Sequence, residues 1–121
     1  MVKEAYVSFD CAKLLKGKGF PQTSFRAHYI KGILYPCENR CGFGDNDIIA
    51  PTQQMATAWL REQNNLYIEI RVDFSDGVYP MYDAFIINLK SCDRYSVLGY
   101  DRYSYYDAVE TSLKYCLTKL I

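Results

Sequence analysis

The chain has 121 residues, half of them hydrophobic, with 14 basic and 14 acidic side chains and no net charge. This composition excludes intrinsic disorder, and the balanced charge argues against proteins that bind nucleic acid mainly by neutralising phosphates. No apolar run approaches the roughly 20 residues of a membrane-spanning helix, and the N-terminus lacks the apolar stretch of a secretory signal. We therefore expect a single domain over residues 1–121, cytoplasmic in a bacterial host cell and without membrane contact.

The first predicted helix runs from Phe9 to about Lys18, with Ser8 as its N-cap and glycines at 17 and 19 as its stop. Residues 25–35 are rich in aromatic and β-branched side chains, which predicts a strand with a bulge at Gly32. Residues 37–49 form the longest irregular stretch, and long loops often carry function.

The second predicted helix opens at Ala50-Pro51-Thr52 and ends at Asn64-Asn65, since proline fits the first helical turn and asparagine tolerates a left-handed end. Its apolar residues share one face: Met55, Ala56, Trp59 and Leu60.

Residues 66–74 alternate strictly between apolar and polar side chains, which is typical of a strand with one buried face in an antiparallel sheet. Ser75-Asp76-Gly77 then predicts a hairpin turn, and the return strand spans about 78–89. Residues 90–103 are irregular, with a possible short strand over 95–100.

The last helix is expected to start after a cap formed by Ser104 and Asp107 and to continue to the C-terminus. Its apolar stripe consists of Val109, Leu113, Cys116, Leu117 and Leu120. Together these elements predict an α+β fold in the order α-β-α-β-β-α, with an antiparallel sheet of three to five strands packed on one side by two or three helices.

The five cysteines are odd in number and are expected to be reduced thiols. Cys37 and Cys41 lie in a glycine-bearing loop at a spacing within the range of zinc sites, and His28 and Cys92 could complete such a set. A local disulfide between Cys37 and Cys41 is the other alternative. Because there is no second close cysteine pair, we expect neither metal nor cofactor. The chain also lacks a nucleophile elbow, a phosphate-binding glycine loop and paired carboxylates, so we do not expect an enzyme.

Three segments carry a resemblance to a known family: YVSF-x-CAKLLK-x-KGF at 6–20, APTQQMA-x-AWLRE at 50–62 and Y-x-A-x-E-x-x-L at 106–113. On these segments the chain resembles a family of short, uncharacterised proteins of prophages and mobile elements in gut bacteria. The family often has glutamate where this chain has Cys11, a difference that bears on helix stability. The resemblance implies a phage-related origin and no catalytic residues.

The chain has twelve tyrosines, and five of them lie between positions 95 and 106. Tyrosine combines a large apolar ring with a polar tip and is enriched at protein interfaces. We expect an interaction protein, acting on a protein partner or on itself as a homodimer. The expected contact residues are Tyr95, Tyr100, Tyr103, Tyr105 and, in the irregular loop, Phe43. The alternatives are a nucleic-acid-associated accessory protein, supported by the net charge of +4 over residues 1–36, and a small Cys/His metal-binding module.

Overall fold

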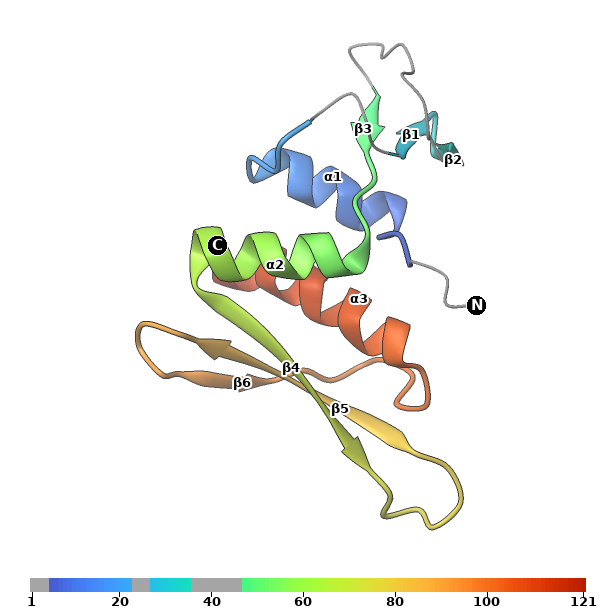
Figure 1. Ribbon diagram of the computed structural model, residues 1–121, viewed down its shortest axis with the longest axis vertical. Helices are drawn as coiled ribbons and strands as arrows, with labels where there is room; N and C mark the ends of the chain where they lie inside the picture. Colours follow the sequence, from blue (N-terminus) through green and yellow to red (C-terminus); the bar gives the residue numbers. More distant parts are fainter. Residues whose placement is uncertain (1–4, 23–26, 36–46) are drawn as a thin grey trace. The chain divides into compact units, whose positions relative to one another are not determined.

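The computed structural model describes residues 5–22, 27–35 and 47–121, which belong to two compact units, Met1–Ala56 and Thr57–Ile121 (Figure 1). The described helices and antiparallel strands confirm the α+β class, and the element order agrees with the prediction. The strands form two sheets of three, in place of the one sheet expected. The expectation of a single domain over 1–121 stays a prediction.

The first unit contains α1 (Phe9–Gly17), which begins where the sequence predicts. The Ser8 hydroxyl accepts a hydrogen bond from the Cys11 N–H at 3.2 Å, which satisfies one of the free donors at the helix start. Cys11, Ala12 and Leu15 lie on one buried face of the helix. This spacing of three and four residues makes α1 amphipathic.

The sheet of the first unit has the order β2-β1-β3, from β1 (His28–Ile30), β2 (Ile33–Tyr35) and β3 (Ile48–Ile49). The prediction of one strand with a bulge at Gly32 is wrong, because the chain reverses there. Lys31 and Gly32 have φ angles of 52° and 80°, and two positive φ angles in succession fit the tight turn of a two-residue hairpin. Glycine adopts such angles without strain, so Gly32 serves the turn.

Long-range hydrogen bonds join the parts of the first unit. The Tyr29 hydroxyl donates to the Val7 carbonyl at 2.6 Å, and the Val7 N–H donates to the Pro51 carbonyl at 3.0 Å. The Ala50 N–H donates to the Ala27 carbonyl at 2.8 Å. These bonds tie the segment after β3 to β1 and to the chain before α1.

The second helix, α2 (Gln53–Asn64), runs across the division between the units. It begins at Gln53, where the Thr52 hydroxyl accepts a hydrogen bond from the Met55 N–H at 3.2 Å, so Pro51 precedes the helix and does not lie in its first turn as predicted. It ends at Asn64, and the φ of 56° at Asn65 places that next residue in the left-handed region that favours asparagine and glycine.

The sheet of the second unit has the order β4-β5-β6, from β4 (Leu66–Asp73), β5 (Met81–Asn88) and β6 (Arg94–Ser96). The β4–β5 register is unbroken over eight residue pairs. The turn between them is longer than predicted and β5 starts at Met81, because turn residues use their N–H groups locally and Pro80 has no N–H to donate. The short last strand lies at 94–96, which overlaps the predicted 95–100.

The last helix, α3 (Tyr105–Tyr115), is followed by a π-helical turn (Cys116–Leu120) and lies against β4 and β5 (Figure 1). The alternation of side chains in β4 and β5 gives the sheet one apolar face, and the apolar stripe of the last helix packs against that face. The most buried hydrophobic side chains of this unit are Leu60, Leu66, Ala84, Ile86, Ala108, Leu113, Cys116 and Leu117. Burial raises the pKa of the Cys116 thiol to about 12.

None of the helices in the described part of the chain combines the length and the hydropathy that crossing a membrane requires.

The buried position of Leu113 generates the first prediction. Its side chain is fully buried in α3, so Leu113→Ala should lower the free energy of unfolding by about 2–5 kcal/mol. Leu98 is 83% exposed, so Leu98→Ala should change it by less than about 0.5 kcal/mol. Urea unfolding of both variants measures the difference, and equal effects would contradict the packing of α3.

Candidate interaction surface

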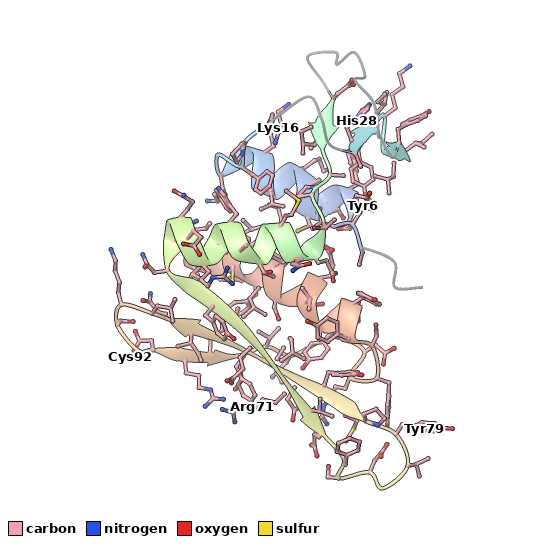
Figure 2. All side chains as sticks on the ribbon, in the orientation of Figure 1. Tyr6, Lys16, His28, Arg71, Tyr79 and Cys92 are labelled. Carbon is pink, nitrogen blue, oxygen red and sulfur yellow. The ribbon has the colours of Figure 1, made fainter. Side chains whose placement is uncertain are left out.

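Large apolar side chains are exposed at the end of the β4–β5 hairpin and at the start of α3. We call six of them the hairpin-end surface: Phe74, Val78, Tyr79, Tyr103, Tyr105 and Tyr106, which are 47–73% exposed. Figure 2 shows Tyr79 projecting from the hairpin. Thirteen large hydrophobic side chains are exposed in the described residues, and these six lie in only two short segments. Contiguous exposed apolar surface often marks an interaction site.

Two aspartates determine the conformation of the hairpin turn. Asp73 Oδ1 accepts a hydrogen bond from the Ser75 N–H at 2.8 Å. Asp76 Oδ1 accepts from the N–H groups of Val78 at 2.9 Å and Tyr79 at 3.0 Å. Aspartate favours such turns because its short side chain can replace a backbone acceptor. The turn that carries three of the surface residues is therefore held by several bonds of its own.

The start of α3 is held in a similar way. The Ser104 hydroxyl accepts from the Asp107 N–H at 3.1 Å, which is the predicted cap. Asp107 Oδ2 accepts from the Asp101 N–H at 2.7 Å, and Asp101 Oδ1 accepts from the Tyr103 N–H at 3.0 Å. The segment that carries Tyr103 and Tyr105 is thus fixed to the first turn of the helix.

A hydrogen bond of 2.9 Å from the Tyr103 hydroxyl to Asp76 Oδ2 joins the two segments. The pKa of Asp76 is lowered, first by the Val78 N–H and then by the Tyr103 hydroxyl, because both bonds favour the carboxylate. The pKa of Tyr103 is raised, because its proton is held by Asp76 and its loss would place two negative charges together.

Tyr105 lies between two further tyrosine rings. Its ring centroid is 5.7 Å from that of Tyr82 on β5 and 5.8 Å from that of Tyr106, both in edge-to-face geometry. Edge-to-face pairs are the arrangement that aromatic rings favour. These contacts limit the motion of Tyr105 although its ring remains about half exposed.

Arg102 lies beside the hairpin-end surface and is paired with two carboxylates. Its guanidinium donates to Asp83 Oδ1 through both Nη2 and Nε, the latter at 3.1 Å, and Nη2 lies 3.4 Å from Asp73 Oδ2. The hydrogen bond to Asp83 raises the pKa of Arg102. The pKa of Asp73 is lowered, mainly by its hydrogen bonds from Ser75 and further by Arg102.

The sheet face that α3 does not cover carries a second charged group. Glu69 Oε1 lies 2.9 Å from Arg71 Nε and 3.1 Å from an Arg94 Nη2 atom. Both guanidinium groups also lie over the Phe85 ring, at 5.1 Å for Arg71 and 4.2 Å for Arg94. Such cation–π contacts orient the arginines across the sheet.

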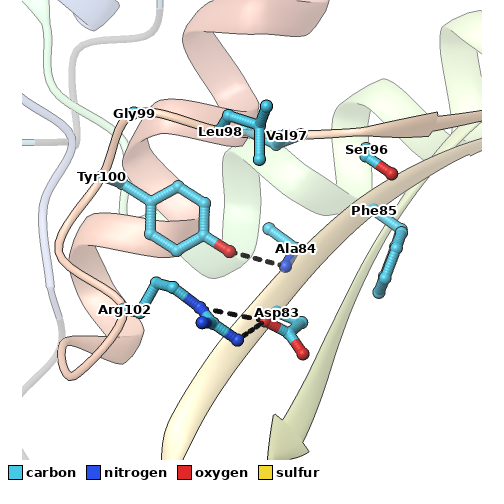
Figure 3. A pocket seen from close by; sticks show the side chains of 9 residues that line it. All are labelled: Asp83, Ala84, Phe85, Ser96, Val97, Leu98, Gly99, Tyr100 and Arg102. Carbon is cyan, nitrogen blue, oxygen red and sulfur yellow. Dashed lines mark hydrogen bonds and ion pairs between the residues drawn. The ribbon is translucent and has the colours of Figure 1, made fainter.

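Tyr100 closes part of one edge of this sheet. The Val97 N–H still donates to the Ala84 carbonyl at 3.0 Å, after which the chain bulges away from β5 and the Tyr100 hydroxyl occupies the gap (Figure 3). It accepts from the Ala84 N–H at 2.8 Å and donates to the Tyr82 carbonyl at 2.9 Å. A hollow of about 310 Å³ lies beside it, between the bulge and β5. One side chain thus replaces the backbone of a neighbouring strand.

The predicted contact residues fall in different environments. Tyr103 and Tyr105 belong to the hairpin-end surface. Tyr95 is half-buried with its ring centroid 6.4 Å from that of Tyr115, and Tyr100 is half-buried with its hydroxyl bonded to β5. Phe43 lies outside the described residues.

Sequence reasoning missed Phe74, Val78 and Tyr79, whereas Tyr106 lies within the tyrosine-rich segment 95–106 but is not among the contact residues named from it. The alternation of residues 66–74 predicts Phe74 on the buried face of the strand, but β4 ends at Asp73 and Phe74 is 68% exposed. The signal that could have found them is a Ser-Asp-Gly turn flanked by large apolar residues.

The alternative prediction is a metal site formed by Cys37, Cys41 and His28. Cys37 and Cys41 lie outside the described residues, so this site stays a prediction. His28 is 2% exposed and stacks on Tyr35, its cross-strand partner, with ring centroids 6.3 Å apart. The described residues contain no group of three His, Cys, Asp or Glu side chains arranged to hold a metal ion.

Comparison of the chain with protein-family models, with curated proteins and with solved structures found no match in any of the three.

Tyr100 generates the second prediction. Tyr100→Phe leaves the Ala84 N–H and the Tyr82 carbonyl without their partner and should lower the free energy of unfolding by about 1–2 kcal/mol. Tyr95→Phe is the matched control and should change it by less than about 0.5 kcal/mol. Urea unfolding measures both, and hydrogen exchange at the Ala84 amide should be faster in Tyr100→Phe alone.

The Asp76–Tyr103 hydrogen bond generates the third prediction. The pKa of Asp76 is lower in the folded protein than in the unfolded chain, so its bonds stabilise the fold at neutral pH, and this stabilisation is lost as the pH falls through the lowered pKa. Tyr103→Phe should raise the Asp76 pKa, which stays below its usual value because the Val78 and Tyr79 N–H groups remain.

Carboxyl ¹³C NMR titration measures this change. Asp73 is the internal control, since its pKa is lowered mainly by Ser75 and should stay as it is. An Asp76 pKa that Tyr103→Phe leaves unchanged would contradict the hydrogen bond.

Proposed function

We propose that this protein acts by binding another protein through the hairpin-end surface, without catalytic activity of its own. The observation that carries the proposal is that six large apolar side chains are exposed on segments that hydrogen bonds hold in place. Exposed aromatic side chains that are already ordered lose little conformational freedom on binding, so they suit an interface.

The composition of the surface also supports a protein partner. Four of its six members are tyrosines and one is phenylalanine, side chains that are enriched where proteins bind one another. Arg102 and its two carboxylates lie at its border, as the polar rim of an interface would. A phage-related accessory role in the cytoplasm of a bacterial host, expected from the resemblance, completes the proposal.

Nucleic-acid association remains the alternative prediction and rests on the excess of basic residues in the first third of the chain. Salt-dependent DNA or RNA binding at low ionic strength would support it.

The fourth prediction tests the proposed function. The double variant Val78→Ser/Tyr79→Ser replaces two exposed side chains, so it should fold normally while partner binding falls about tenfold or more. Leu98→Ser is the matched control, because Leu98 is exposed but lies outside the surface. Immobilised full-length wild type and both variants are compared by quantitative mass spectrometry of the proteins they retain from a bacterial lysate.

The proposal requires proteins that the wild type and Leu98→Ser retain equally and that the double variant loses. Equal retention by all three, or no specific retention by the wild type, would contradict it.

A further inference from the structure

The strand β4 has a neighbour on one side only. The Leu89 N–H donates a hydrogen bond to the carbonyl of Asn65, the residue directly opposite it. Because hydrogen-bonded pairs alternate along an antiparallel ladder and the register is unbroken, the odd-numbered residues of β4 form the hydrogen-bonded pairs with β5. The N–H and carbonyl groups of Ile68, Ile70 and Val72 therefore point to the opposite edge. In the ranges that the structure describes, no strand pairs with that edge.

The two edges of this sheet differ. The edge opposite β4 is β6, which has only three residues, and beyond it β5 bonds the Tyr100 hydroxyl and the Arg102 carbonyl, which accepts from the Tyr82 N–H at 2.7 Å. The β4 edge lacks several of the usual protections, because residues 66–73 contain no proline, lysine or bulge, and its three charged side chains, Glu69, Arg71 and Asp73, are of both signs. A long edge strand of this kind is a template for pairing with another strand.

The burial of side chains changes from the central strand to this edge. On the face toward α3, Ala84 and Ile86 of β5 are 2% and 0% exposed. Ile68 and Ile70 of β4 lie on the same face but are only half-buried, and Val72 is 53% exposed. A further strand beside β4 would cover these side chains.

We propose that β4 pairs with β4 of a second copy of this chain, antiparallel, about a two-fold axis at Ile70. The hydrogen-bonded pairs are then Ile70 with Ile70 of the second copy and Ile68 with Val72 of the second copy. This inference goes beyond the proposed function, because it concerns a different surface and a defined partner.

Charge complementarity indicates that the strand beside β4 is β4 of a second copy, and it indicates the register of the pairing. With the axis at Ile70, Glu69 lies opposite Arg71 of the second copy, and Arg71 lies opposite Glu69 of the second copy. These fall at non-hydrogen-bonded pairs, where opposing side chains are closest. In the next pair outward, Tyr67 lies opposite Asp73 of the second copy, where the tyrosine hydroxyl could donate a hydrogen bond to the carboxylate. The strand is thus complementary to itself.

Neighbouring registers lose this match. An axis at residue 69 places Glu69 opposite its own copy, and an axis at residue 71 does the same with Arg71, and like charges directly opposite are destabilising. The sequence Glu69-Ile70-Arg71 therefore favours the axis at Ile70 over the axes at residues 69 and 71.

The fifth prediction tests this pairing by sedimentation equilibrium of the full-length chain. The wild type should dimerise between micromolar and millimolar concentrations. Glu69→Arg and Arg71→Glu each place like charges at two pairs, so each should raise the dimer dissociation constant about tenfold or more. An equimolar mixture of the two variants should dimerise again, because every arginine then faces a glutamate.

Circular dichroism and urea unfolding of each variant check that it folds, and amide exchange gives a second readout. The outward amides of Ile68, Ile70 and Val72 should exchange more slowly at dimer-forming concentrations than in dilute solution. Recovery in the mixture supports the pairing. A wild type that stays monomeric at millimolar concentration overturns it. A dimer that neither variant weakens also overturns it, and neither result bears on partner binding by the hairpin-end surface.

Discussion

The unbroken pairing of β4 with β5 is the constraint on which the second unit depends. A single register over eight pairs determines which side chains share each face, because successive residues of a strand point to opposite sides. Ala84 and Ile86 are thereby directed toward α3, while Glu69 and Arg71 fall on the other face. The hairpin also continues into a turn whose apolar side chains stay exposed. Both the core and the candidate surface therefore follow from one register.

Carboxylates organise the exposed end of the hairpin. Asp76 accepts two turn N–H groups and the Tyr103 hydroxyl, and Asp107 and Asp101 bond the segment before α3. Each of these bonds is weak on its own at a solvent-exposed site. Together they fix the backbone under the exposed aromatic side chains, which lowers the entropy that a binding partner would have to offset.

The parts of this fold that depend on local sequence could be predicted. Ser8 and Ser104 cap helices because their hydroxyls reach N–H groups three residues on, and strict alternation predicted β4. The hairpin at Lys31-Gly32 was not predicted, because a single glycine in a strand-like segment is compatible with either a bulge or a turn. Composition predicts a contact role for the tyrosines as a group, which stays a prediction. The difference in exposure between Tyr103 and Tyr100 depends on the path of the 97–102 segment, which residue type does not encode. Phe43, Cys37 and Cys41 lie outside the described residues, so their predicted roles stay predictions.

The shortness of β6, with the Tyr100 side chain beyond it, has a consequence for how large an assembly can become. A sheet with two open edges can add copies at both ends and polymerise, which is the route to fibres. Here the far edge is β6, which has only three residues, and Tyr100 and Arg102 bond the groups of β5 beyond it. The proposed two-fold pairing through β4 would consume the other edge in both copies. Growth would then stop at a pair, because a very short edge strand is one of the ways in which sheets avoid further pairing.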